Sequence, residues 1–232
     1  MAPSLSTCPS FSILLLCISL SWTSATGEGE GGGREGESSD VLLNAHAILN
    51  TVGWGILLPC GVLAARYVKP FADPAWFYAH ITLQIFGYAL GVAGWVTGLN
   101  LDDEDAKGGN PDKHGAIGAI LFGICTLQML ALFLRPNKDH KIRKAWNLYH
   151  YSLAASILIL GIINIFEGFE IMSPPAKWRR TYIGILVALG GVAIMLEIVT
   201  WIYVCRKKRY SQVALHGATV GGTYQFEKGA LG

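Results

Sequence analysis

Five long apolar runs constrain this sequence more than any other feature. In a chain of 232 residues, 52% are hydrophobic and 15% are charged, and the apolar residues gather in segments 42–65, 76–99, 114–134, 147–167 and 181–205. Each run reaches the roughly 20 residues that a helix needs to cross a hydrocarbon core about 30 Å thick. Because a backbone in lipid must satisfy its own hydrogen bonds, the runs predict helices. We expect an all-α membrane protein with five transmembrane helices, the first four forming a bundle.

A shorter apolar stretch near the N-terminus has a different interpretation. Residues 11–22 are too few to span comfortably, and small residues ending at Ala25 follow them. This pattern predicts a signal peptide over residues 1–25, with a retained anchor as the alternative. The Gly- and Glu-rich segment 26–40 is expected to be a disordered tether. Asp40 is expected to cap the first transmembrane helix.

The basic residues predict how the membrane domain, residues 41–205, is oriented. If the signal places the N-terminus outside, 12 of the 18 Lys and Arg residues fall in segments that face the cytosol. An excess of basic residues is typical of cytosolic loops. An odd number of spans then gives a cytosolic tail over residues 206–232.

Four histidines recur near the start of the first four apolar runs, at His46, His80, His114 and His150. An ionisable group inside a membrane segment is by default a candidate for function. With the predicted orientation, His46 and His114 lie near the outer face, and His80 and His150 near the inner face. Alternate helices of an up-down bundle face each other across the core. Each pair can therefore clamp one iron-bearing macrocycle. A hydrogen-bonded structural role, a zinc or copper site and a proton relay are the alternatives.

Small residues share the helical face of the second histidine. The steps are of three or four residues along His80, Gln84, Gly87, Gly91, Gly94 and Gly98. Such spacing places all six on one face. Two interpretations remain open: a large flat group lies against the glycines, or the glycines pack neighbouring helices together.

The membrane domain resembles the cytochrome b561 family, in the plant form often fused to a DOMON domain. The most specific segment is RPNKDHKIRKAWNLYH, residues 135–150, and the other three histidine-bearing runs extend the similarity over residues 42–205. The resemblance implies two non-covalent haem b groups with bis-histidine ligation by His46 and His114, and by His80 and His150. We expect no DOMON domain between the signal and the first helix. After His150 the chain reads YSLAAS, where the family tends to have another histidine and glycines.

The resemblance also implies electron transfer from cytosolic ascorbate to monodehydroascorbate or a ferric chelate on the opposite side. Ascorbate is an anion, and the inner loops offer a cationic site for it by attraction and hydrogen bonding. The candidate substrate residues are Arg66, Lys69, Arg135, Lys138, Lys141, Arg143 and Lys144. The alternative is that these residues only anchor the inner face on anionic lipid. No separate catalytic side chain is predicted, because haem carries the redox chemistry.

The leading functional hypothesis is thus a transmembrane ascorbate-dependent oxidoreductase or ferric reductase. A haem-bearing subunit that serves a partner protein, or a membrane scaffold without turnover, is the alternative. We expect an integral protein of the secretory pathway, in the plasma membrane or a vacuolar or vesicle membrane. Membrane lipid is an expected partner and nucleic acid is not. The sequence leaves the oligomeric state open, a homodimer included.

Overall fold

The computed structural model describes residues 35–101, 107–137 and 139–230, with side chains described only within 39–212. Every secondary-structure element in those ranges is helical. Five of these helical segments are long and apolar enough to cross a membrane. The predicted all-α fold with five spans is confirmed. The predicted signal peptide, residues 1–25, and most of the predicted tether lie outside the described residues.

The first span is one continuous helical path made of four elements. They are α2 (Glu35–Val52), the π-helix η2 (Gly53–Leu57), α3 (Leu58–Leu63) and the π-helix η3 (Ala64–Val68). Pro59 lies at the start of α3, directly after η2, at the point where the continuous helix changes from π to α geometry. The predicted cap at Asp40 is wrong, because α2 begins at Glu35 and Asp40 is already inside the helix.

The next three spans are α4 (Ala75–Gly98), α5 (Pro111–Leu130) and α6 (Arg143–Met172), and local sequence signals mark the start of α5 and the end of α6. The Asn110 side chain accepts a hydrogen bond from the Lys113 backbone N–H at 2.9 Å and caps α5, and Pro111 takes the first helical position. Helix α6 ends where Ser173 adopts a left-handed conformation with φ of 44°. Two prolines follow, which cannot continue the helix.

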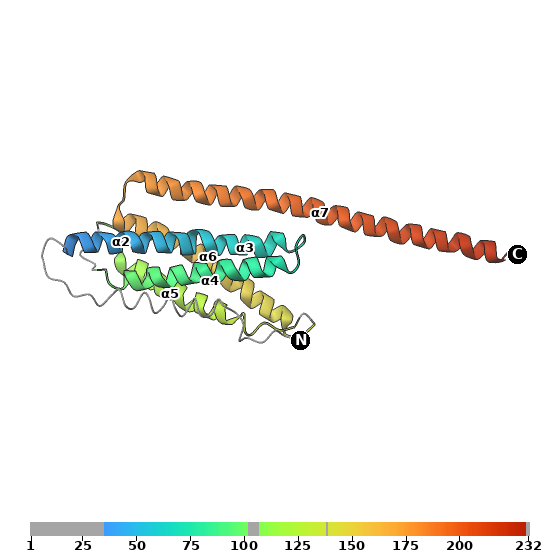
Figure 1. Ribbon diagram of the computed structural model, residues 1–232, viewed down its shortest axis with the longest axis horizontal. Coiled ribbons are helices and arrows are strands. Elements are labelled where there is room, and N and C mark those ends of the chain that lie inside the picture. The colour runs from blue at the N-terminus through green and yellow to red at the C-terminus, as the bar shows by residue number, and fades with distance from the viewer. Residues whose placement is uncertain (1–34, 102–106, 138, 231–232) are drawn as a thin grey trace. The chain divides into compact units, whose positions relative to one another are not determined.

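The first four spans form a bundle in which neighbours along the chain lie side by side (Figure 1). The most extensive contacts join α2 with α4 and α5 with α6, while α4 also contacts α5 and α6 contacts α2, η2 and α3. Consequently α2 lies across the bundle from α5, and α4 lies across from α6. These are the two helix pairs that carry the histidines.

The fifth span belongs to α7 (Ala176–Ala230). Its first residues are part of the bundle unit, which extends to Ile183, and the rest of α7 forms a second unit. Within the bundle unit, Tyr182 is almost fully buried, and its ring lies 5.6 Å from that of Phe166 and 5.9 Å from that of Phe169. The start of α7 is thereby fixed to the end of α6.

Candidate functional site

The four histidines come together as two pairs. The ring centroids of His46 and His114 lie 5.8 Å apart, and those of His80 and His150 lie 6.2 Å apart. In both pairs the planes are steeply inclined, at 65° and 75°. The helix faces that bear the histidines therefore meet across the bundle.

Three of the histidines are held by backbone carbonyls of another helix. The Nδ1 atoms of His46 and His80 lie 2.8 Å from the carbonyl oxygens of Gly94 and Gly61, and Nδ1 of His114 lies 3.1 Å from that of Asn164. A carbonyl oxygen only accepts, so Nδ1 carries the proton and donates in each bond. Nε2 is then the unprotonated nitrogen, which is the form that ligates a metal.

The spacing of each pair fits one metal ion between two imidazoles. A metal–imidazole bond of about 2 Å, with the ring centroid about 1 Å behind the nitrogen, separates two opposed centroids by about 6 Å. Among the described residues, no group of three or more His, Cys, Asp or Glu side chains is placed to hold a metal. Each site thus offers two ligands. This number suits an iron whose other four positions are filled by a macrocycle.

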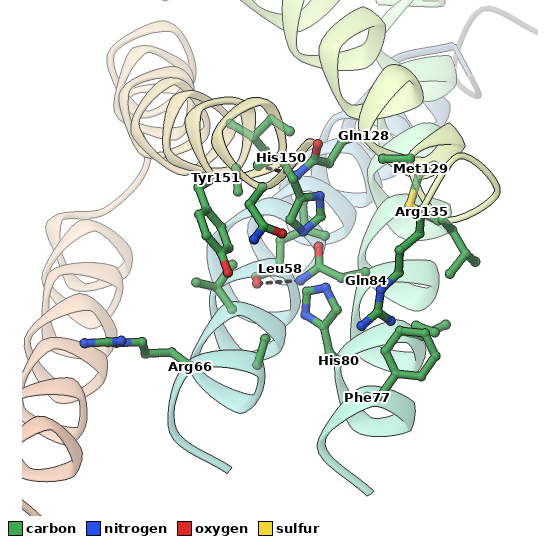
Figure 2. A pocket seen from close by; sticks show the side chains of 18 of the residues that line it. Leu58, Arg66, Phe77, His80, Gln84, Gln128, Met129, Arg135, His150 and Tyr151 are labelled. Carbon is green, nitrogen blue, oxygen red and sulfur yellow. Dashed lines mark hydrogen bonds between the residues drawn. The ribbon is translucent and has the colours of Figure 1, made fainter. Parts of the chain in front are cut away.

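A cavity of about 520 Å³ surrounds the second pair. His80 and His150 face one another across it, and Gln84 and Arg135 extend beside them (Figure 2). Most of the wall is apolar, with side chains such as Leu58, Ile81, Ile85 and Ile157. An apolar wall with basic groups at one end suits a flat apolar ring that carries acidic substituents.

The basic groups around this cavity are four of the seven predicted substrate residues. They are Arg66, Lys69, Arg135 and Arg143. Lys141 and Lys144 are exposed and do not line the cavity, and Lys138 lies outside the described residues. Arg66 extends away from the two histidines (Figure 2).

Arg135 is half-buried and packs against two aromatic rings. Its guanidinium lies 4.4 Å from the ring centre of Phe77 and 5.9 Å from that of Trp76. Burial, and next the positive charge of Arg143, lower the pKa of Arg135. Arginine nevertheless stays protonated in proteins. The cavity wall therefore holds two cations, Arg135 and Arg143, that repel one another. A bound anion would stabilise both.

The sequence analysis missed the aromatic part of this site. Trp76, Phe77 and Trp146 all line the cavity, and Gln128 reaches it from α5. Trp146 and His150 are one helical turn apart, a spacing at which side chains on a helix meet. The spacing of four residues between Trp146 and His150 is the sequence signal that indicates this contact.

The glycine face of α4 has a packing role. A Cβ on Gly91 would lie 2.8 Å from the Trp54 indole, one on Gly94 would lie 2.6 Å from the Asn50 amide, and one on Gly98 would lie 2.6 Å from the His46 ring. The glycines thus receive side chains of the first span. Of the two interpretations left open by the sequence, close packing between helices is confirmed for these three positions.

Comparison with known proteins identifies relatives of this domain. Residues 45–173 match the family model of eukaryotic cytochrome b561. Two cytochrome b561 and DOMON domain-containing proteins of Arabidopsis thaliana are 49% and 46% identical to the chain, over 79% and 84% of its length. Ferric-chelate reductase 1 of Bos taurus is 30% identical over 70% of the chain and 29% of its own length. No solved structure matches the chain.

The chain spans about half the length of the curated plant relatives that it matches, 45% and 49% of the two above. The matched segment contains all four histidines and extends from the middle of α2 to the end of α6. Members of the matched family bind haem b. On these grounds the chain belongs to the eukaryotic cytochrome b561 family and is an integral membrane protein.

Proposed function

We propose that this protein transfers electrons across a membrane through two b-type haems. One haem lies between His46 and His114 and the other between His80 and His150. The observation that carries the proposal is the spacing of the two pairs, each with room for one iron and with Nδ1 protons directed at backbone carbonyls in three of the four histidines. The pairs lie toward opposite ends of α4, since His80 is near its start and Gly98 at its end contacts His46.

The distance between the sites suits passage across a bilayer. His80 and Gly98 are 18 positions apart on one helix, a rise of about 27 Å. Bound haem supplies one-electron iron chemistry. The protein holds the two imidazoles of each site, excludes water with an apolar wall and sets the local electrostatics.

The donor that we propose is cytosolic ascorbate, and the acceptor is monodehydroascorbate or a ferric chelate on the other side. Ascorbate monoanion loses one electron and one proton to give monodehydroascorbate, and a ferric acceptor that gains the electron becomes ferrous. Lys69, Arg135 and Arg143 at the cavity beside His80 and His150 supply cations for the anionic donor. An anion bound there offsets the repulsion between Arg135 and Arg143. This assignment places the N-terminus outside and the tail in the cytosol.

The decisive experiment uses the purified chain in liposomes, with a ferric chelate inside and ascorbate outside. The test variant is K69Q/R135Q, which removes two cations from the cavity. The matched control is K207Q/K208Q, which removes two exposed cations of the tail. We expect the test variant to slow reduction by ascorbate about tenfold, since steering by local charge changes association rates by about 10 to 1,000 times. The control should stay at the wild-type rate.

Salt provides an independent check. The screening length falls from about 10 Å at 0.1 M to about 3 Å at 1 M salt. The wild-type rate should therefore fall with salt, and the test variant should respond less. A neutral donor should reduce wild type and variant alike. Equal rates with ascorbate at all salt concentrations would contradict a donor site at this cavity.

The same assay separates the proposal from a subunit that serves a partner protein. This alternative has support in the relatives, which are about twice as long as the part that the chain matches. A chain whose haems are reduced by ascorbate, but which passes no electrons to the enclosed chelate, would favour the subunit. A chain that binds no haem would favour the scaffold.

A further inference from the structure

His150 differs from the other three histidines in how its ring is held. The Nδ1 atoms of His46, His80 and His114 each bond to a backbone carbonyl. Nδ1 of His150 is buried and has no hydrogen-bond partner. A buried imidazole that lacks this bond needs another contact to fix its plane.

That contact comes from Trp146, one turn earlier on α6. The Trp146 and His150 rings are stacked, with centroids 4.9 Å apart and planes inclined by only 9°. The other ring contacts of the four histidines in the described structure are inclined, by 65° and 75° across the bundle and by 57° between His150 and Tyr151. The indole therefore covers a face of the imidazole and sets its orientation.

The indole is itself held in place. The Arg143 guanidinium lies 4.8 Å from the centre of the Trp146 ring, and Arg143 Nη1 donates to the Pro136 carbonyl at 2.6 Å. From α5, Gln128 Nε2 donates to the backbone carbonyl of His150 at 2.8 Å. The two contacts of Arg143 fix the indole against the loop before α6. The hydrogen bond from Gln128 fixes the backbone that carries the imidazole.

We propose that Trp146 is the positioning residue of the inner haem ligand, holding the His150 imidazole by stacking where the other three are held by a backbone hydrogen bond. The inference rests on the proposed ligation of haem by His150. It has two consequences. The plane of the His150 ring depends on Trp146, and its Nδ1–H, which has no acceptor, makes His150 a weaker electron donor to iron than its partner His80.

The test compares three variants of the full chain, W146L, W146F and W178L. Leucine removes the stacking, while phenylalanine keeps an aromatic ring. Trp178 is the control, because it also lies beneath a basic side chain, with Lys177 Nζ 5.5 Å from its ring centre, but within the described residues it neither lines the cavity nor stacks on an imidazole. The readouts are the electron paramagnetic resonance signals of the ferric haems and carbon monoxide binding to the ferrous haems.

We expect W146L to change the signal of one haem and leave that of the other unchanged. The population in which His150 has left the iron should rise about 2- to 13-fold, the fold-change that stacking of an aromatic pair provides, and one ferrous haem should then bind carbon monoxide. W146F should return both readouts toward wild type, and W178L should match wild type. Loss of the inner haem in W146L with retention in W146F would also support the inference.

Three results would overturn it. They are a W146L protein with wild-type spectra, equal changes in W146L and W146F, and the same change in W178L. The wild-type spectrum decides the proposed function separately. A wild type that holds two haems, beside an unchanged W146L, removes only the role of Trp146. A wild type without haem removes the proposed function itself.

Discussion

If the two histidine pairs hold haem as proposed, the substitution Gly98→Ala should disturb the site at His46 and His114 and spare the site at His80 and His150. Gly98 ends α4 and lies directly against the His46 ring. An added Cβ would stand 2.6 Å from Cε1 and 2.7 Å from Nδ1 of His46, whereas ordinary contact begins at 3.4 Å. The imidazole must therefore move by about 0.8 Å, or the two helices must separate by that amount.

A movement of this size acts on a short hydrogen bond. His46 Nδ1 donates to the Gly94 carbonyl at 2.8 Å. Displacement by about 0.8 Å away from the carbonyl lengthens the N–O distance to about 3.6 Å, beyond the range of a hydrogen bond, and a lost bond of this kind costs about 0.5–1.5 kcal/mol. Overpacking adds about 1–3 kcal/mol. Loss of an orienting bond behind a metal ligand lowers metal affinity about 10- to 100-fold, so the haem between His46 and His114 should be retained poorly.

The assay counts haems per chain and records the resonance signal of each in Gly98→Ala, with Gly123→Ala as the control. Gly123 lies in α5, and a Cβ there meets no atom within 4 Å. The control should bind two haems and gain about 0.4–1 kcal/mol of stability from the stiffer unfolded chain. A Gly98→Ala protein with both signals unchanged would show that His46 either tolerates the displacement or ligates nothing.

Three further outcomes are expected. His80→Ala should remove one haem and preserve the signal of the other, and His46→Ala should do the reverse; identical losses in the two variants would contradict the proposed pairing. The free energy of unfolding of Gln128→Met should lie within about 1 kcal/mol of the wild-type value, because the lost hydrogen bond to the His150 carbonyl is offset by removal of the buried Oε1 atom, which has no partner. Gln128→Ala should lower the free energy of unfolding by about 2 kcal/mol or more, because the shorter side chain leaves a cavity. The temperature at which haem is released measures the stability of both variants. Mass spectrometry should find a mature N-terminus near Thr26, and external protease should spare a C-terminal tag; a cleaved tag on intact cells would reverse the predicted orientation.

The spans and the meeting of the histidines were predictable from the sequence for one physical reason. Hydrophobic length sets where a membrane helix runs, and position along that helix sets the depth of each side chain. His46 and His114 start two spans that run in one direction, and His80 and His150 start two that run in the other. Equal depth on opposed helices then brings the members of each pair together, as the ring distances show. The role of the histidines as ligands stays a prediction.

The cationic residues of the inner loops were harder to place. The charge pattern alone predicted all four of these residues equally as substrate-binding residues: Arg135, Lys141, Arg143 and Lys144. The folded loop turns Arg135 and Arg143 toward the cavity and leaves Lys141 and Lys144 exposed. The difference comes from contacts between the loop and its neighbouring helices, since Arg135 packs on Phe77 of α4 and Arg143 at the start of α6 donates to the Pro136 carbonyl. Such contacts have no periodicity that a sequence pattern could reveal.

The role of the α4 glycines could not be predicted from their spacing, because it depends on which element packs against their face of the helix. Spacing placed Gly91, Gly94 and Gly98 on one face of α4, but it could not distinguish a ligand from a helix opposite that face. The structure puts the first span there, and its polar side chains make the close approach specific: Trp54 Nε1 donates to Asn50 Oδ1 at 3.0 Å, and Asn50 Nδ2 donates to the His46 carbonyl at 2.8 Å. A bulkier residue at any of these glycines would therefore press on a hydrogen-bonded column that ends at a histidine. Packing and ligand geometry are thus coupled in this bundle, because the residues that let the helices approach also determine where His46 stands.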